Sequence, residues 1–195
     1  MNYKNTNQSL LILDLDETLI HARTEPLERK AAFNVFHFHV YKRPFLDDFL
    51  HFIKEHFYVG VWSSASDDYV NEIVAAIFPE HYPLEFVWGR SRCTMRSQYY
   101  EEHFGRYLED YSNPYVYLKR LQKLKRHGFS LERMLIVDDS PEKCTCNYGN
   151  AIYPTAYWGA VDDQELPLLA NYLMTLKDVT NVRTLEKRGW QSFAS

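Results

Sequence analysis

The sequence predicts an α/β protein with a doubly wound parallel sheet, helices on both faces and a small β insert after the first strand. Short apolar runs of strand length alternate with segments whose apolar residues recur at helical spacing. Two of the apolar runs end in acidic residues, at Asp14 and Asp138. Parallel sheets bind ligands at the carboxyl ends of their strands, so both acids are expected on one side of the sheet. We expect no large cap domain.

Five short apolar runs predict buried parallel strands, because strands covered on both faces carry apolar side chains at successive positions. These runs are residues 9–15, 57–62, 85–88, 134–137 and 151–153. The second run is followed by four small residues, 63–66, and the fourth by Asp138 and Asp139. Polar residues therefore cluster where the strands end.

Apolar residues at helical spacing predict four helices. They cover residues 45–56, 67–78, 114–127 and 164–176. Pro44 precedes the first helix, Ser66 is a candidate N-cap of the second, and Gly128 ends the third. Lys119 would lie early in the third helix, and Pro141 is placed to begin a further helix.

The predicted β insert covers residues 31–43, where aromatic and aliphatic residues alternate with polar ones as in a half-exposed strand or hairpin. His37 and His39 lie in this insert, but no third ligand is in register, so an exposed face explains them better than a metal site. Residues 89–113 are polar and aromatic without a clear period, and form a possible substrate-facing insert.

Length and composition fit a single domain over residues 1–195, with a core of about 9–176. The chain has 195 residues, of which 46% are hydrophobic and 25% charged. The net charge of −4 argues against direct nucleic-acid binding. Three cysteines without a framework spacing, and no apolar leader, predict a reducing location, cytoplasmic or nuclear. No apolar run reaches membrane-spanning length, and the oligomeric state stays open.

The strongest chemical signal is a set of carboxylates at two strand ends. Asp14 and Asp16 follow the first strand, and Asp138 and Asp139 follow another. Three or four carboxylates in a small volume repel one another unless a cation neutralises them. Mg²⁺ is a hard ion that prefers oxygen ligands and often shares them with phosphate. The sequence therefore predicts a Mg²⁺ site.

A carboxylate next to Mg²⁺ can attack phosphorus and form an aspartyl-phosphate, which divides hydrolysis into two easier steps. Asp14, nearest the strand end, is the candidate nucleophile, and Asp16 is the candidate general acid and base. Lys119 and Ser64 are placed to stabilise charge on the transferring phosphoryl group. Each residue taken singly also fits a helix cap, a turn or a solvated helix face.

Four segments together carry a family resemblance, and they are residues 14–19, 62–66, 117–119 and 136–141. In this order they resemble the motif series of the haloacid dehalogenase superfamily. The match is closest to its branch of small RNA polymerase II C-terminal-domain phosphatases, and it extends over about residues 9–176. Ser64 stands where that branch more often has Thr, and Asp139 where it often has Asn.

The resemblance implies a role for each candidate residue. The catalytic residues would be Asp14, Asp16, Lys119 and Ser64. The substrate- or phosphate-binding residues would be Thr18, Ser64, Lys119 and Arg90. Mg²⁺ would be held by Asp14, the backbone carbonyl of Asp16, and Asp139, with Asp138 close by.

Three functions remain open at this point. The first is a protein serine/threonine phosphatase, whose open site would admit a phosphorylated polypeptide. The second is a small-metabolite phosphatase, in which residues 89–113 fold over the site. The third is a non-catalytic peptide-binding module. Four arginines would form a basic wall for an acidic substrate or a solvated loop, and they are Arg90, Arg92, Arg96 and Arg106.

Overall fold

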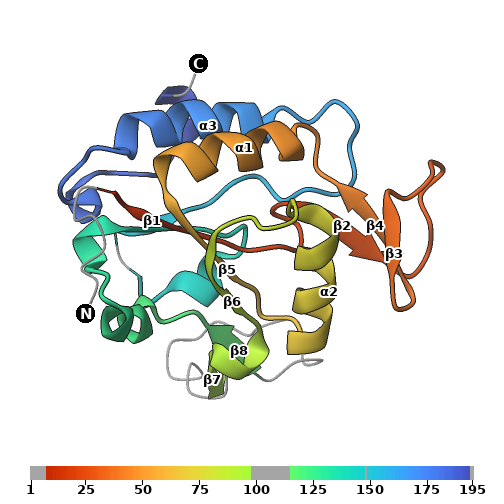
Figure 1. Ribbon diagram of the computed structural model, residues 1–195, viewed down its shortest axis with the longest axis horizontal. Coiled ribbons are helices and arrows are strands. Elements are labelled where there is room, and N and C mark those ends of the chain that lie inside the picture. Colours follow the sequence, from red (N-terminus) through yellow and green to blue (C-terminus); the bar gives the residue numbers. More distant parts are fainter. Residues whose placement is uncertain (1–7, 98–114, 148, 194–195) are drawn as a thin grey trace, which may run out of the picture.

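A five-stranded parallel sheet forms the centre of the computed structural model, which describes residues 8–97, 115–147 and 149–193 (Figure 1). Its strands are β1 Leu10–Leu13, β5 Tyr58–Trp62, β6 Leu84–Trp88, β9 Met134–Val137 and β10 Ala151–Ile152. The order is β10-β9-β1-β5-β6. The chain starts at the central strand, adds two strands on one side and then two on the other. The predicted doubly wound sheet is confirmed, and its switch point lies at β1.

Both faces of the sheet are covered. Successive residues of β1 point to opposite sides and belong to different apolar clusters. Leu11 and Leu13 belong to one apolar cluster together with the buried faces of three α-helices. These are α1 Leu46–His56, α2 Asp67–Ile77 and α3 Glu165–Leu176. Leu10 and Ile12 belong to a second cluster, on the other face, with the 3₁₀ helix η3 Leu121–His127. A four-residue strand of apolar residues thus serves two cores at once.

The first two α-helices begin close to their predicted positions. Leu46, Phe49 and Ile53 are buried in α1, at the spacing that places side chains on one helix face. Ser66 occupies the N-cap position of α2, but its side chain makes no capping hydrogen bond. The first turn of α2 carries Asp67 and Asp68, which stabilise the positive end of the helix dipole.

The β insert is larger than predicted and begins at Ile20 rather than residue 31. It is a three-stranded antiparallel sheet in the order β2-β4-β3. Its strands are β2 Ile20–Arg23, β3 Phe33–Val35 and β4 Phe38–Lys42. The alternating segment is a hairpin with His37 in its turn and His39 in β4, so the two histidines do not lie along one strand.

The predicted helix over 114–127 is wrong in its first part. Tyr115–Leu118 forms strand β8, which pairs antiparallel with β7 Thr94–Ser97 in a separate two-stranded sheet. Tyr-Val-Tyr-Leu is rich in aromatic and β-branched residues, which favour a strand when a partner is present. Helical structure starts only at Leu121, so Lys119 lies between a strand and a helix. Residues 98–113, including Arg106, lie outside the described residues.

Short 3₁₀ helices complete the described chain, and they are η1 Arg90–Arg92, η4 Leu131–Arg133, η5 Pro141–Cys144, η6 Val182–Thr184 and η7 Trp190–Phe193. Pro141 starts η5, as predicted. The packed structure extends past residue 176, because Trp190 is buried and its indole donates to the carbonyl of Tyr153. Among the described residues there is no large cap domain and no helix long and apolar enough to cross a bilayer.

Candidate active site

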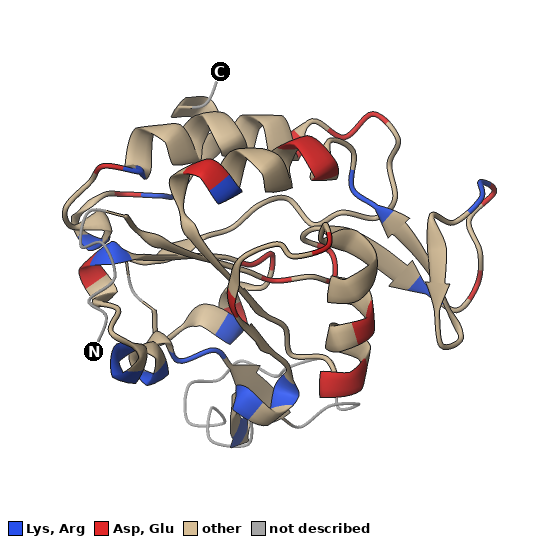
Figure 2. Ribbon diagram, viewed as in Figure 1, with Lys and Arg blue, Asp and Glu red and all other residues tan. Residues whose placement is uncertain are grey.

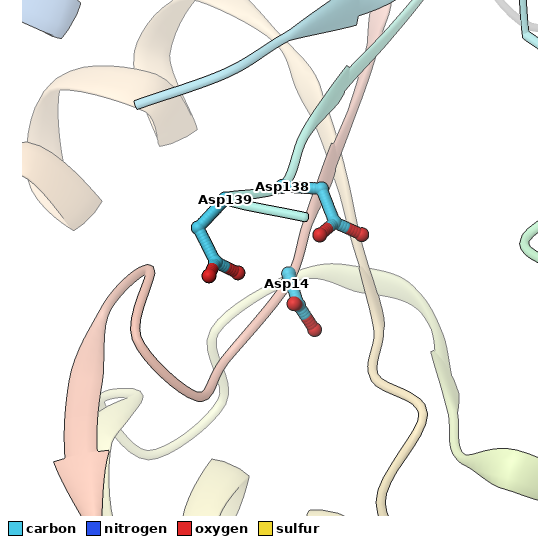
Figure 3. A group of neighbouring side chains, drawn as sticks. All are labelled: Asp14, Asp138 and Asp139. Atoms are coloured by element: carbon cyan, nitrogen blue, oxygen red, sulfur yellow. The ribbon is translucent and has the colours of Figure 1, made fainter. Parts of the chain in front are cut away.

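The acidic cluster lies at the carboxyl ends of β1 and β9. These strands pair in parallel with Leu13 opposite Val137, and the Asp14 amide donates to the Val137 carbonyl at 2.9 Å. Asp14 and Asp138 are each the first residue after their strand, and Asp139 follows. Carboxylate oxygens of all three lie within 4.8 Å of one another (Figure 3). The pairing of two strands thus brings together residues that are 124 positions apart.

Asp16 reaches the site through a sharp turn after β1. Glu17 has a positive φ of 57°, and its amide donates to the Ile20 carbonyl at 2.8 Å, which closes the loop. The Tyr69 hydroxyl, from α2, donates to Asp16 Oδ1 at 2.6 Å. Burial raises the pKa of Asp16 to about 6, although the bond from Tyr69 opposes this shift. Asp16 is therefore poised to exchange a proton near neutral pH.

Lys119 is completely buried between two carboxylates. Its Nζ lies 2.7 Å from Asp14 Oδ1 and 2.6 Å from Asp138 Oδ2. Burial disfavours the ammonium, but Asp138 and Asp14 raise the pKa of Lys119 well above its usual value. The backbone is fixed on both sides: the Lys119 amide donates to the Lys143 carbonyl at 2.9 Å, and Asn147 donates to the Lys119 carbonyl at 2.6 Å. These bonds, rather than a helix, position the lysine.

Asp14 combines deep burial with an incompletely satisfied carboxylate. Burial opposes its charge, but Lys119 and Lys143 lower the pKa of Asp14 below its usual value. Neither oxygen accepts a hydrogen bond of normal geometry within the described part of the chain, despite the close ammonium of Lys119. An ionised, underbonded oxygen at this position is available to a cation or to an electrophile.

The two acids after β9 have different surroundings. Asp138 uses both oxygens, accepting from Lys119 at 2.6 Å and from the Ser140 amide at 2.9 Å. Asp139 is only half-buried and is held by Thr18, whose hydroxyl accepts from the Asp139 amide at 3.2 Å. Asp138 is therefore placed to orient Lys119, whereas Asp139 keeps oxygen lone pairs for another ligand.

The remaining predicted residues lie near the end of β5. Ser64 is half-exposed, and its carbonyl accepts from Arg90 Nε at 2.8 Å. Arg90 is exposed, with its guanidinium 5.0 Å from the centre of the Tyr117 ring. Ser63 is the first residue after β5 and is buried, with its hydroxyl oxygen accepting from the Ala65 amide at 3.0 Å. Ser63 thus stands at its strand end as Asp14 and Asp138 do at theirs.

Three residues of this site were not singled out from the sequence: Ser63, Tyr69 and Lys143. Ser63 directly precedes the predicted Ser64, and the sequence does not show which of the two is the first residue after β5. Lys143 follows Asp139 by four residues, in η5, and this short spacing was the one available signal. Tyr69 reaches Asp16 from a distant segment, so no local pattern indicated it.

The donor set suits a hard divalent cation. Asp14 and Asp139 offer carboxylate oxygens at short separation, and the excess of negative charge at the site favours a cation there. Thiols are a poor match, since Cys144 is turned to Asp138, with Sγ 3.7 Å from its Oδ2. The residues present therefore fit Mg²⁺ better than a thiophilic metal such as zinc.

Comparison with known proteins identifies the family of this chain. The sequence matches the family described as NLI interacting factor-like phosphatase over residues 9–183. "CTD small phosphatase-like protein 2" of Dictyostelium discoideum is 31% identical over 180 residues, covering 89% of this chain and 28% of the relative. The human "Carboxy-terminal domain RNA polymerase II polypeptide A small phosphatase 1" is 25% identical over 186 residues, covering 92% of this chain and 63% of the relative.

A solved structure shows the same fold. The fission yeast RNA polymerase II CTD phosphatase Fcp1, in a variant bound to beryllium fluoride, superposes with a TM-score of 0.56 at 17% identity, covering 97% of this chain and 53% of that one. Fold and motifs together define a haloacid dehalogenase-like α/β protein. The chain belongs to the NLI interacting factor-like phosphatase family. It spans 28% and 52% of the length of two Dictyostelium discoideum relatives.

Proposed function

We propose that this protein is a Mg²⁺-dependent phosphomonoester hydrolase that forms an aspartyl-phosphate on Asp14. The observation that most supports this is the state of Asp14 itself. It is buried, ionised and underbonded, at the end of the central strand and beside a buried lysine. A carboxylate used only for stability would be expected to have its hydrogen bonds completed.

The proposed reaction has two steps. In the first, an Asp14 oxygen attacks phosphorus, the bond to the leaving oxygen breaks, and Asp16 gives that oxygen a proton. In the second, Asp16 takes a proton from water as its oxygen attacks the same phosphorus, the bond between phosphorus and the Asp14 oxygen breaks, and inorganic phosphate leaves. Asp14 and the proton on Asp16 are both restored. Lys119 neutralises charge on the phosphoryl oxygens in both steps.

Mg²⁺ fits the oxygen-rich part of this site. Asp14, Asp139 and the backbone carbonyl of Asp16 would hold it, while Asp138 is engaged by Lys119. When bound, the ion supplies positive charge that lowers the repulsion between the carboxylates and a phosphate dianion. Thr18 contributes indirectly, since its hydroxyl fixes the backbone of Asp139.

The substrate class we propose is phosphoserine or phosphothreonine on a polypeptide. The human relative named above is, by its name, a small phosphatase of the carboxy-terminal domain of RNA polymerase II. In this chain, exposed arginines follow β6, and Figure 2 shows basic residues in the η1 region (residues 90–92). Such a surface attracts acidic, phosphorylated chains. A cytoplasmic or nuclear location belongs to the same proposal.

Hydrolysis of p-nitrophenyl phosphate tests the chemistry. We expect activity with Mg²⁺, loss of activity with EDTA, and loss in Asp14→Asn, which keeps the size of the side chain but not its nucleophilic charge. Activity that survives either change would overturn the mechanism. The values of kcat/KM for phosphopeptides and for sugar phosphates then test the substrate class, and a strong preference for the small esters would favour the metabolite phosphatase instead.

A further inference from the structure

A second lysine lies beside the proposed nucleophile. Lys143 belongs to η5, and its Nζ is 3.6 Å from Asp14 Oδ2. Lys119 approaches the other oxygen, Oδ1, at 2.7 Å. The Asp14 carboxylate therefore has one ammonium group near each of its oxygens, and the proposed reaction uses only one of them.

The two lysines differ in how firmly they are held. The Lys119 side chain is inaccessible to solvent and is anchored on Asp138. The Lys143 side chain is 22% exposed, and 3.6 Å is too long for a hydrogen bond. Its backbone, in contrast, is fixed, since its amide donates to the Ser140 carbonyl and its carbonyl accepts from Lys119. Lys143 thus combines a fixed backbone with a side chain whose ammonium group can move toward a ligand of Asp14.

The charge of Lys143 acts in opposite directions on the two ligands of this site. Lysine is cationic at neutral pH, with an ordinary pKa of about 10.4, and the Lys143 ammonium lies 3.6 Å from Asp14 Oδ2. A divalent cation bound to Asp14 is repelled by this charge. A phosphate dianion brought to Asp14 is attracted by it.

We infer that Lys143 is a second phosphate-binding residue, which strengthens phosphate binding and weakens divalent-cation binding at the same site. This inference rests on the proposed function. It concerns a residue that touches the substrate phosphate, and it predicts effects of opposite sign for two ligands. A lysine that only supported the fold would not produce opposite effects, because damage to the site weakens both.

The test compares Lys143→Met with a matched control, Lys125→Met, which removes the same charge from an exposed position on η3. Calorimetry measures the Kd for Mg²⁺ alone and the Kd for inorganic phosphate at saturating Mg²⁺. We expect Lys143→Met to weaken phosphate binding about tenfold, the effect of one charge-assisted hydrogen bond, and to tighten Mg²⁺ binding about threefold or more. The KM for p-nitrophenyl phosphate should rise in parallel with the phosphate Kd.

Two further results complete the design. Lys143→Arg keeps the charge and should retain most of the phosphate affinity, whereas Lys125→Met should change neither constant. Unchanged phosphate binding in Lys143→Met, or loss of affinity for both ligands together, would overturn the inference. If the wild-type protein hydrolyses no phosphomonoester, the proposed function fails, but the two binding constants still decide the role of Lys143.

Discussion

Replacing Arg43 by Met should destabilise the fold strongly, because this buried guanidinium joins three separate segments. It lies directly after β4, and its Nε and Nη2 bind the two carboxylate oxygens of Asp163 at 2.8 and 2.9 Å. Nη1 donates to the carbonyl of Thr18 at 3.0 Å, and Nη2 donates to the carbonyl of Thr155 at 2.8 Å. The β insert, the loop after β1 and the segment before α3 therefore share one side chain.

The magnitude follows from what the substitution leaves behind. Met fills similar volume but leaves the carbonyls of Thr18 and Thr155 without this donor. Among the described residues, the Asp163 carboxylate then keeps only the Glu165 amide as donor. Removing one partner of a buried pair costs about 3–5 kcal/mol. The Asp163 side chain keeps 15% exposure, so water solvates part of its charge and the lower end applies, about 3 kcal/mol. Arg43→Lys, which keeps the charge but loses the fork of donors, should fall between Met and wild type.

The neighbouring residue provides a control. Lys42 also pairs with an aspartate, Asp47, at 3.0 Å, but these side chains are 31% and 78% exposed. Exposed pairs contribute about 0–1 kcal/mol, so Lys42→Met should be nearly neutral. Urea unfolding followed by circular dichroism gives both free energies on one scale. If the two variants differed by less than about 1 kcal/mol, the reasoning from burial would be refuted.

Three other predictions concern the site and its supporting sheet. Tyr69→Phe removes a donor that stabilises the Asp16 carboxylate, so the pKa of Asp16 should rise further above its usual value. For alkyl phosphates, whose leaving oxygen needs a general acid, the fall in kcat with increasing pH should then move to higher pH. A move to lower pH would contradict this. Lys119→Met should lower kcat at least about 100-fold for p-nitrophenyl phosphate, the effect of losing one buried donor, and near-normal kcat would exclude its role. Gly60→Ala places a methyl group 2.5 Å from the Phe86 ring and should cost about 1–3 kcal/mol in thermal unfolding, a loss that Phe86→Ala in the same chain should partly relieve.

The sequence predicted the sheet because its signals were local and consistent. Every central strand is a short apolar run, and the acids come at strand ends. The convergence of Asp14 with Asp138 and Asp139 also followed from local information, since parallel neighbours end on the same side. Where local signals and topology agree, a single sequence is sufficient.

The errors share a physical cause, which is dependence on a partner that the local sequence does not show. Tyr115–Leu118 fits a strand or a helix by its apolar content, and pairing with Thr94–Ser97 decides between them. The sequence also does not show which of two neighbouring serines is buried: the observed end of β5 places Ser63 in the interior and leaves Ser64 half-exposed, and the role of Ser64 stays a prediction. The contact of Tyr69 with Asp16 depends on where α2 packs, which no spacing reveals.

A phosphatase needs a rigid support for its reacting groups and a surface that fits its substrate, and the central position of β1 provides the rigid support. Hydrogen exchange should be slowest in the amides of this strand, because both of its edges are paired and its four residues have no solvent exposure. Asp14, the proposed nucleophile, is thus attached to the part of the molecule that opens least. The β7–β8 ribbon and the β insert belong to separate small sheets. Substitutions in these outer elements can therefore change the preference for a substrate without displacing Asp14.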